Sequence, residues 1–270
     1  MTPEYVIFTD LDGTLLDHHS YSFKPSLPAL AKLKEFQIPV VLVSSKTYPE
    51  IRNYQGEMGL EAYPFVVENG SAIYTPPEYF EDFGHYTLVD NHWEFSLGRS
   101  YSELVDILAE ISGKYHYTIK GFHNSEESEI ISRTGLDPEQ VKLALTRKFS
   151  VPVFYDVRSR NILCAELEKY GLHLLFGGRF MHLLGLVDKG TALIKIMDGY
   201  RSKYPSRRFR SLALGDSLND FAMLRSADDA VLVRKHDGTH ETREVIPDVI
   251  FSPGIGPAGW NDSVLNIIRN

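Results

Sequence analysis

The segment Asp10-Leu-Asp-Gly-Thr14 places two carboxylates two residues apart, directly after the short apolar run 5–9. Length, β-branching and the turn that follows predict a buried strand for this run. Ligands of open parallel sheets bind at the carboxyl ends of the strands, so both carboxylates are expected to face one ligand. Asp10 can then act as a nucleophile toward phosphorus and bind a metal, while Asp12 can protonate a leaving oxygen. A lone Asp-x-Asp would instead favour an acidic helix-capping turn.

A second acidic motif, Gly215-Asp-Ser-Leu-Asn-Asp220, also stands where a strand is expected to give way to a helix. Mg²⁺ prefers oxygen ligands and commonly takes one or two carboxylates plus a substrate phosphate. Asp216 can share such an ion with Asp10, and Asp220 would lie near enough to hold a metal-bound water. Helix capping is the alternative interpretation of Asp216 and Asp220. Capping is compatible with metal binding, but it does not explain the pairing with Asp10.

Two further residues complete this predicted site. Ser44 ends the second apolar run, where its hydroxyl and nearby backbone amides can hold phosphoryl oxygens. Lys189 opens a helical stretch, where a cation is unfavourable for the helix dipole. Its position therefore indicates another purpose, namely to neutralise the nucleophile and the transferring phosphoryl group. Taken singly, Ser44 would be interpreted as a cap and Lys189 as a solvated surface residue.

The elements that must position these residues follow a regular pattern. Apolar runs at 5–9, 39–44 and 64–68 alternate with helical patterns from Leu27 and from Thr47, which is typical of a parallel sheet with helices on both faces. Between about residues 84 and 185 the pattern of alternating strands and helices changes.

In this stretch, helical spacing at 99–115 and 137–149 accompanies strand-like runs at 151–155 and 179–184. We therefore predict an α/β core from residues 1–84 and 186–270, and an inserted α+β domain at 85–185 that covers one end of the sheet.

Composition excludes several classes of protein. The net charge of −8 argues against nucleic acid as the main partner, since phosphate backbones demand a basic surface. No apolar stretch is long enough to span a bilayer, and residues 1–10 lack the pattern of a secretory signal. A single cysteine, Cys164, rules out an internal disulfide and suits a reducing cytoplasm. A cytoplasmic protein that binds neither membrane nor nucleic acid is expected; the sequence does not specify its oligomeric state.

The two acidic motifs together with Ser44 and Lys189, in their order along the chain, resemble the haloacid dehalogenase (HAD) superfamily of phosphatases. The pattern of that superfamily is Asp-x-Asp-Gly-Thr, a strand-end Ser or Thr, a Lys, and Gly-Asp-x-x-x-Asp. The resemblance implies a Rossmann-like core and an inserted cap of the larger, C2 type. It implies that Asp10 is the nucleophile and Asp12 the general acid and base. Mg²⁺ would be held by Asp10, the backbone carbonyl of Asp12, and Asp216, with Asp220 in support. The expected phosphate-binding residues are Ser44, Thr14 and Asn219.

Four segments are similar to the mannosyl-3-phosphoglycerate phosphatase family: Ser44-Ser-Lys-Thr47, Glu68-Asn-Gly70, Gly177-Gly-Arg-Phe-Met-His182 and Gly215-Asp-Ser-Leu-Asn-Asp220. This family hydrolyses mannosyl-3-phosphoglycerate to mannosylglycerate, a compatible solute. The substrate is then a phosphorylated sugar acid. Arg179 offers a planar fork suited to its carboxylate. In a strand, residues 179 and 182 would point to opposite faces, which favours Arg179 over His182. The expected substrate contacts are Arg179, His182, Lys46, Asn69 and Gly178.

Several alternatives stay open at this point. The sugar can be mannose or glucose, and the enzyme can be a broader sugar-phosphate phosphatase or a phosphomutase. From a different class, the chain can be a phosphometabolite-binding protein without catalysis. The retention of Asp10, Asp12, Lys189 and Asp216 weighs against a mere binder, which has no use for an acid beside a nucleophile.

Overall fold

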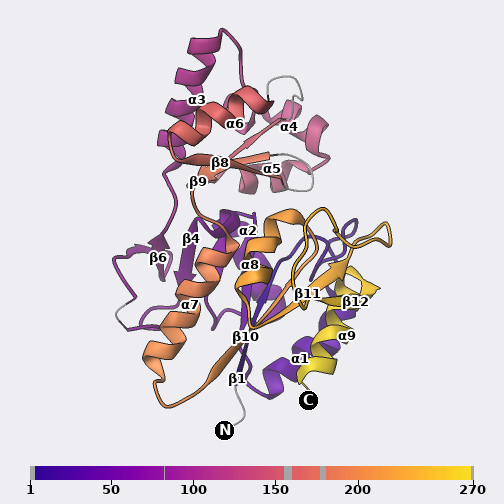
Figure 1. Ribbon diagram of the computed structural model, residues 1–270. Coiled ribbons are helices and arrows are strands. Elements are labelled where there is room, and N and C mark those ends of the chain that lie inside the picture. The colour runs from indigo at the N-terminus through magenta and orange to yellow at the C-terminus, as the bar shows by residue number, and fades with distance from the viewer. Residues whose placement is uncertain (1–3, 82, 155–159, 177–180, 269–270) are drawn as a thin grey trace.

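The computed structural model describes residues 4–81, 83–154, 160–176 and 181–268, and consists of a larger core beneath a smaller cap (Figure 1). Both ends of the chain lie at the end of the core that is far from the cap. The strands are β1 (Glu4–Thr9), β2 (Val40–Val43), β3 (Phe65–Val67), β4 (Ala72–Thr75), β5 (Thr87–Val89), β6 (His92–Ser96), β7 (Val151–Val153), β8 (Leu172–Phe176), β9 (Met181–Gly185), β10 (Phe209–Gly215), β11 (Asp229–Arg234) and β12 (Ile250–Ile255). The α-helices are α1 (Leu27–Glu35), α2 (Tyr48–Met58), α3 (Tyr101–Tyr115), α4 (Glu127–Thr134), α5 (Pro138–Ala144), α6 (Arg160–Lys169), α7 (Lys189–Lys203), α8 (Phe221–Ser226) and α9 (Gly256–Ile268).

Within the described residues, nine strands form the core sheet, in the order β12-β11-β10-β1-β2-β3-β4-β6-β5. The neighbours from β12 through β3 are parallel, and the last three pairings are antiparallel. Strand β1 therefore lies inside the parallel part of the sheet, between β10 and β2. The predicted α/β class with a parallel sheet is confirmed.

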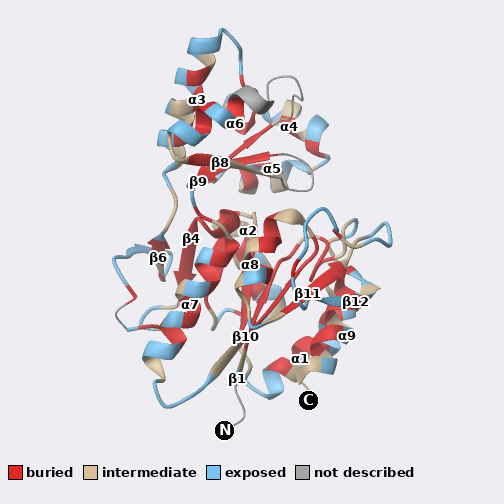
Figure 2. Cartoon of the chain, in the orientation of Figure 1, coloured by how far each residue is buried: buried red, intermediate tan, exposed pale blue. Residues whose placement is uncertain are grey.

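Helices cover both faces of this sheet, and Figure 2 colours much of β10 and β11 as buried. Along β1, Val6 and Phe8 pack with residues of α7 and α8, whereas Ile7 packs with α1 and α9. Because neighbouring side chains of a strand point to opposite faces, a strand buried on both sides must be apolar throughout. The uninterrupted apolar runs of the sequence follow from this requirement.

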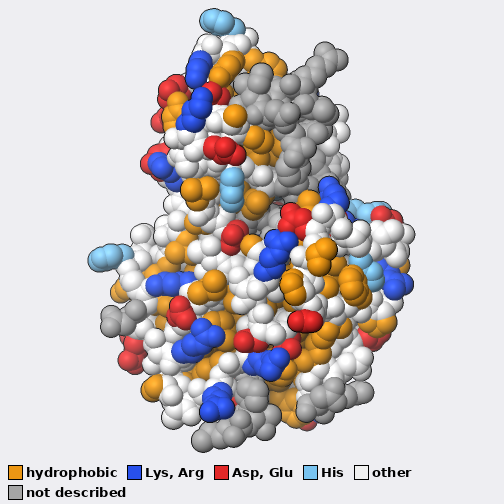
Figure 3. Space-filling view, viewed as in Figure 1, with side chains coloured by type: hydrophobic (Ala, Val, Ile, Leu, Met, Phe, Trp, Pro, Cys, Tyr) orange, Lys and Arg blue, Asp and Glu red, His pale blue; other side chains and the backbone are white. Residues whose placement is uncertain are grey.

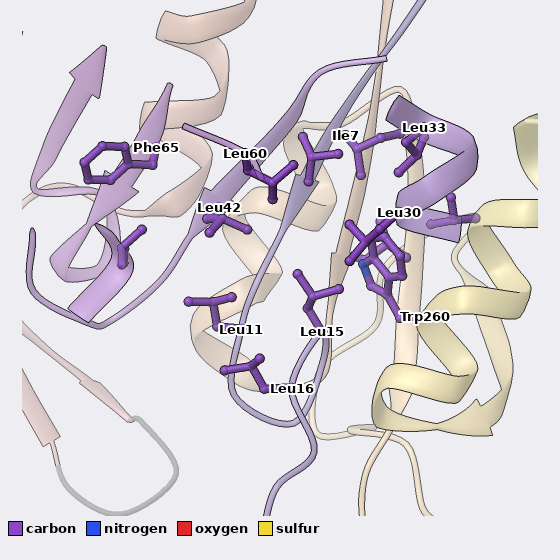
Figure 4. Packing of buried hydrophobic residues seen from close by; sticks show 14 of the residues in the cluster. Ile7, Leu11, Leu15, Leu16, Leu30, Leu33, Leu42, Leu60, Phe65 and Trp260 are labelled. Atoms are coloured by element: carbon purple, nitrogen blue, oxygen red, sulfur yellow. The ribbon is translucent and has the colours of Figure 1, made fainter. Parts of the chain in front are cut away.

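The loop after β1 is itself part of the core. Leu11, Leu15 and Leu16 are fully buried and lie beside Leu42 and Trp260 (Figure 4). The indole Nε1 of Trp260 donates a hydrogen bond to Thr9 Oγ1 (2.9 Å). The apolar side chains thus anchor the loop so that its carboxylates are held on a rigid base.

The cap has a core of its own. Within the described part of the chain, β7, β9 and β8 form a three-stranded antiparallel sheet. Leu104, Leu108 and Ile111 of α3 and Leu167 of α6 pack on this sheet. On the face shown in Figure 3, acidic and basic side chains are interspersed over the core rather than gathered into one charged surface. Among the described helices, none combines the length and apolarity that crossing a membrane requires.

The predicted start of the insert, at residue 85, is corrected by the pairing of β5 and β6. Both strands extend the core sheet beyond β4, so residues 87–96 belong to the core. The chain enters the cap only at α3. These strands are short, and β6 buries His92 and Glu94, so their sequence lacks the apolar signal of the central strands. Glu94 is tolerated there because Tyr74 Oη and Lys148 Nζ donate hydrogen bonds to it.

The predicted helix over 137–149 is shorter than expected, since α5 ends at Ala144. The reason is a competing acceptor in the core, the buried carboxylate of Glu68. The backbone N–H groups of Lys148 and Phe149 donate to Glu68 (2.9 and 3.1 Å), and so does Ser150 Oγ (2.7 Å). These bonds take the place of helical ones and fasten the cap segment 148–150 to the core.

Glu68 is presented by a turn, η2 (Glu68–Gly70), whose backbone is unusual. Glu68, Asn69 and Gly70 all have positive φ (49°, 61° and 100°). A Cβ at Gly70 would lie 2.1 Å from the carbonyl oxygen of Asp188, which immediately precedes α7. Only glycine combines this φ with so close an approach of two backbones.

We expect Gly70→Ala to destabilise the protein by about 2–4 kcal/mol, because the added methyl group must displace the start of α7 and strain the turn. The measurement is denaturant unfolding followed by circular dichroism. Gly113→Ala is the matched control, since a Cβ at Gly113 in α3 meets nothing within 4 Å. We expect this control to raise the stability by about 0.5–1 kcal/mol, as for an exposed helical glycine. Equal stabilities of the two variants would contradict the steric argument.

Candidate active site

The two acidic motifs meet because their strands are neighbours. Strand β1 pairs in parallel with β10, with Thr9 opposite Leu214, so both strands end at the same level. The N–H of Asp10 donates to the carbonyl of Leu214 (3.0 Å), which fixes the first residue of the loop. Asp216 follows β10 directly. Because the two strands are parallel and in this register, Asp10 and Asp216 lie together at the carboxyl ends of β1 and β10.

Lys189 lies between the carboxylates. Its Nζ donates to Asp10 Oδ1 and to Asp220 Oδ1, both at 2.6 Å, and its side chain is fully buried. Asp188 caps the helix by accepting a hydrogen bond from the N–H of Thr191 (2.8 Å). Lys189 is therefore the first residue of α7 and can reach across to β1. The predicted neutralisation of Asp10 by this lysine agrees with the geometry.

The cluster carries more negative than positive charge. Burial, together with the charge of Asp220, raises the pKa of Asp10 to about 7, although Lys189 opposes the shift. Burial and the same neighbour raise the pKa of Asp216 well above its usual range. Burial by itself lowers the pKa of Lys189, but Asp10 and Asp220 raise it overall. The site is built to hold one more positive charge.

A divalent cation fits this requirement. Asp10, Asp216 and Asp220 each offer a carboxylate oxygen, and these three atoms lie within 4.8 Å of one another. Hard cations such as Mg²⁺ prefer oxygen ligands, and in this buried place a cation would offset the mutual repulsion of the carboxylates. The residues can therefore hold the metal that the sequence predicts.

Neighbouring groups fix these carboxylates. Asp220 Oδ2 accepts hydrogen bonds from the N–H groups of Asp216 and Ser217, both at 3.0 Å. Asp220 thus orients the loop that carries Asp216. A Cβ at Gly13 would lie 2.9 Å from Asp216 Oδ2, so the two motifs can approach only with glycine there. Thr14 is fully buried and donates to Asp216 Oδ1 (3.3 Å). This hydroxyl therefore positions a carboxylate, and the predicted contact of Thr14 with phosphate stays a prediction.

Ser44, Asn69 and Asn219 form a linked group behind the carboxylates. The carbonyl of Ser44 accepts from the N–H of Asn69 (2.9 Å), and Asn219 Nδ2 donates to Asn69 Oδ1 (3.1 Å). Asn219 lines the pocket described below, whereas Ser44 and Asn69 are fully or almost fully buried beneath it. Asn69 therefore supports Asn219 in this structure.

Asp12 occupies a different environment from Asp10. Its side chain is 38% exposed, and Oδ2 forms an ion pair with Lys46 Nζ (2.9 Å). Oδ1 has no hydrogen-bond partner among the described residues. The charges of Asp12 and Glu50 raise the pKa of Lys46 overall, although burial alone lowers it. Lys46 thus holds Asp12 in place, and one oxygen of Asp12 is left for proton transfer.

These groups open into a pocket of about 510 Å³ between core and cap. His182 of β9 lines the pocket, while the adjacent Met181 packs in the core of the cap. The expected alternation of this strand is therefore observed, and His182 is on the side of the pocket. The prediction that favoured Arg179 over His182 did not anticipate this position. Arg179 and Gly178 lie outside the described residues.

Many pocket residues were not predicted from the sequence, because they come from segments far apart in the chain. They include His18, Tyr21, Ser45, Glu50, Phe122, Leu136, Ala144, Arg147, Lys235, His236, Asp237 and Arg243. Only the folded cap and the loop after β11 bring them to the same place, so no local pattern could have identified them.

Comparison with known proteins identifies the family and the fold that this chain resembles. Residues 7–84 match the family of haloacid dehalogenase-like hydrolases. A solved structure of the phosphatase BT1666 of the haloalkanoate (HAD) superfamily, from Bacteroides thetaiotaomicron, has the same fold. Its TM-score is 0.68, with 16% identity over 99% of this chain and 96% of that one.

Two curated relatives are similar along nearly the whole chain, and both are named glucosyl-3-phosphoglycerate/mannosyl-3-phosphoglycerate phosphatase. The one from Methanococcoides burtonii is 34% identical, and the one from Persephonella marina is 38% identical. Each comparison covers 98% of this chain and 97% of the relative. The chain therefore belongs to the haloacid dehalogenase-like hydrolases, as a phosphatase of that superfamily.

Replacing Lys189 tests the charge balance of the cluster. We expect Lys189→Met to cost about 3–5 kcal/mol of stability at pH 8 without metal, because it leaves buried carboxylates uncompensated. Carboxyl groups whose pKa is raised on folding bind more protons when folded than when unfolded. Their contribution to stability is therefore lost as the pH rises, and the cost should be smaller at pH 5.5. Denaturant unfolding at both pH values measures it.

Lys46→Met is the matched control for this variant, since its partner Asp12 is partly exposed. We expect this change to cost less than Lys189→Met at pH 8 and to depend less on pH. If the two variants lost equal stability, the buried position of Lys189 would not be the decisive feature.

Proposed function

We propose that this phosphatase hydrolyses mannosyl-3-phosphoglycerate to mannosylglycerate and inorganic phosphate, with Mg²⁺ as cofactor and the glucosyl compound as the alternative substrate. The observation that carries the proposal is the environment of Asp10. It is a buried carboxylate whose Oδ1 is held by Lys189 at 2.6 Å, in a pocket that also contains Asp12. The names of the two curated relatives support the choice of substrate.

In the first step, a carboxylate oxygen of Asp10 attacks phosphorus and forms an aspartyl-phosphate. The bond between phosphorus and the glycerate oxygen breaks, and its electron pair stays on that oxygen. Asp12 gives its proton to the departing oxygen. Asp12 suits this role because Lys46 fixes its orientation and its Oδ1 is not engaged by the protein.

In the second step, water attacks the phosphorus of the aspartyl-phosphate. Asp12, now a carboxylate, takes a proton from this water as the new bond forms. The bond from phosphorus to Asp10 breaks, and inorganic phosphate leaves. Lys189 stabilises the negative charge of Asp10 and of the phosphoryl oxygens throughout, which is where most of the barrier reduction in phosphoryl transfer originates.

Asp10 and Asp216, with Asp220 in support and the backbone carbonyl of Asp12, are the residues that would hold Mg²⁺. When bound, the ion supplies positive charge to the phosphoryl oxygens and to the crowded carboxylates. Ser44, Thr14 and Asn219 remain the proposed phosphate contacts. Arg179, Gly178, His182, Lys46 and Asn69 remain the proposed contacts to the rest of the substrate. A pocket of about 510 Å³ is within the usual range for small ligands.

Phosphate release from mannosyl-3-phosphoglycerate with Mg²⁺ tests the proposal, beside the glucosyl analogue and a panel of common sugar phosphates. We expect kcat/KM for one or both glycosyl-3-phosphoglycerates to exceed that for the other compounds. Asp10→Asn should lower kcat more than about 1,000-fold, since the neutral amide cannot attack phosphorus. Asp198→Asn is the control, because Asp198 is an exposed residue of α7 that pairs with Arg201.

The outcomes separate the alternatives. Comparable slow release from every compound would retain the mechanism and refute the substrate. An isomeric sugar phosphate without free phosphate would identify a phosphomutase. Substantial turnover by Asp10→Asn would contradict the proposed nucleophile.

Metal binding should be coupled to proton release. Asp10 has a pKa raised to about 7, and a carboxyl group must lose its proton to bind a cation. The pKa of Asp216 is raised as well, so we expect Mg²⁺ affinity to rise with pH from 5.5 through 7, by about tenfold per pH unit for each proton released. Calorimetry in buffers of different ionisation enthalpy measures both the affinity and the protons released. An affinity that does not change with pH would show that the carboxylates are already ionised.

A further inference from the structure

Arg147 lies in the cap segment that joins α5 to β7, next to the residues that Glu68 fastens to the core. Its Nη1 donates to the backbone carbonyl of Ser45 (2.9 Å) and to Ser150 Oγ (3.2 Å). Ser150 Oγ in turn donates to Glu68. The guanidinium is therefore fixed at the junction of cap and core, and it forms part of the pocket wall.

The charge of Arg147 sets it apart from the other Lys and Arg residues of this wall. Lys46 pairs with Asp12 (2.9 Å), while Lys235 and Arg243 both pair with Glu241 (2.6 and 2.7 Å). For Arg147, no ion pair is found within the described residues. Its Nε is also buried there without a hydrogen-bond partner. A buried donor without an acceptor is costly, and a ligand oxygen would remove that cost.

His182 lies close enough to be affected by this charge. Burial, then the charges of Arg147 and Lys189, lower the pKa of His182 well below its usual range, so its ring is neutral at pH 7. Arg147 is therefore the pocket-lining cation near His182 that no described carboxylate neutralises. Asp10, where the phosphoryl group must be placed for in-line attack, lines the same pocket.

We infer that Arg147 binds the carboxylate of the glycerate part of the substrate. The inference rests on the proposed function, because a phosphoglycerate ester carries a second anion besides its phosphate. With the phosphoryl group at Asp10 and Lys189, the second anion needs a separate cation. Arg147 supplies one, since Nη1 is held by the protein while Nε and Nη2 offer further N–H groups to a planar carboxylate. Arg147 is thus a specificity-determining residue in addition to the predicted Arg179.

The test compares Arg147→Gln with the unmodified enzyme on two substrates. One is mannosyl-3-phosphoglycerate, and the other is the analogue in which the carboxylate is reduced to a hydroxymethyl group. For the first, kcat/KM should fall by about 30-fold or more, mainly through KM, since a charged partner is lost. For the second, it should change by less than about threefold. Arg147→Lys should restore only part of the loss, because a point charge does not replace the planar fork.

Arg133→Gln is the matched control, an exposed arginine of α4 in the cap that Glu129 already engages. It should change both substrates by less than about threefold, as a cation that is already paired. Equal losses of kcat/KM on both substrates for Arg147→Gln would overturn the inference and indicate that Arg147 only joins the cap to the core. Discrimination by Arg179→Gln but not by Arg147→Gln would overturn it as well.

A binding measurement distinguishes a failure of the inference about Arg147 from a failure of the proposed function. Mannosylglycerate carries the carboxylate but no phosphate, so its affinity can be measured by calorimetry whether or not the enzyme turns over. We expect Arg147→Gln to weaken this binding about 30-fold. If the unmodified enzyme releases phosphate from neither substrate, the proposed function fails, and this titration alone decides the role of Arg147. Equal affinity in both proteins, or no binding to the unmodified enzyme, would overturn the inference.

Discussion

The buried ammonium group of Lys189 is the interaction on which the rest of the site depends. It stands between Asp10 and Asp220 with no exposure to solvent, and Asp216 adds a further carboxylate beside them. Charges removed from water are tolerated only when they are paired with good geometry. Each element around the cluster therefore serves this pairing: β1 and β10 end together, α7 begins at Lys189, and Gly13 permits the close approach.

The excess of negative charge in this cluster affects both the stability of the fold and the reactivity of the site. A site made neutral by its own side chains would have little affinity for a cation or for a transferring phosphoryl group. Here the carboxylates outnumber the lysine, and burial together with the charge of Asp220 raises the pKa of Asp10. The same crowding that costs folding free energy prepares the pocket to bind a metal and to attack phosphorus.

The core and the cap supply different residues of the pocket, and Glu68 connects the two parts. The proposed chemistry uses residues at the ends of core strands, while His182 and Arg147 come from the cap. Glu68 contributes no charge to the pocket wall. Instead it binds two backbone N–H groups and a hydroxyl of the cap segment 148–150. This anchor explains why α5 ends early and why Arg147 is placed at the boundary between the two parts.

The sequence by itself determined the parallel α/β core and the carboxylate cluster, because strand ends, apolar runs and acidic loops are local patterns. It did not determine β5 and β6, whose buried Glu94 needs partners from β4 and from the cap. Nor did it determine the role of Thr14, which depends on the distance to Asp216. Only the tertiary structure decided the cap side of the pocket. Arg147 lies 102 residues from Ser45 in the chain, and no local pattern records a contact made by folding.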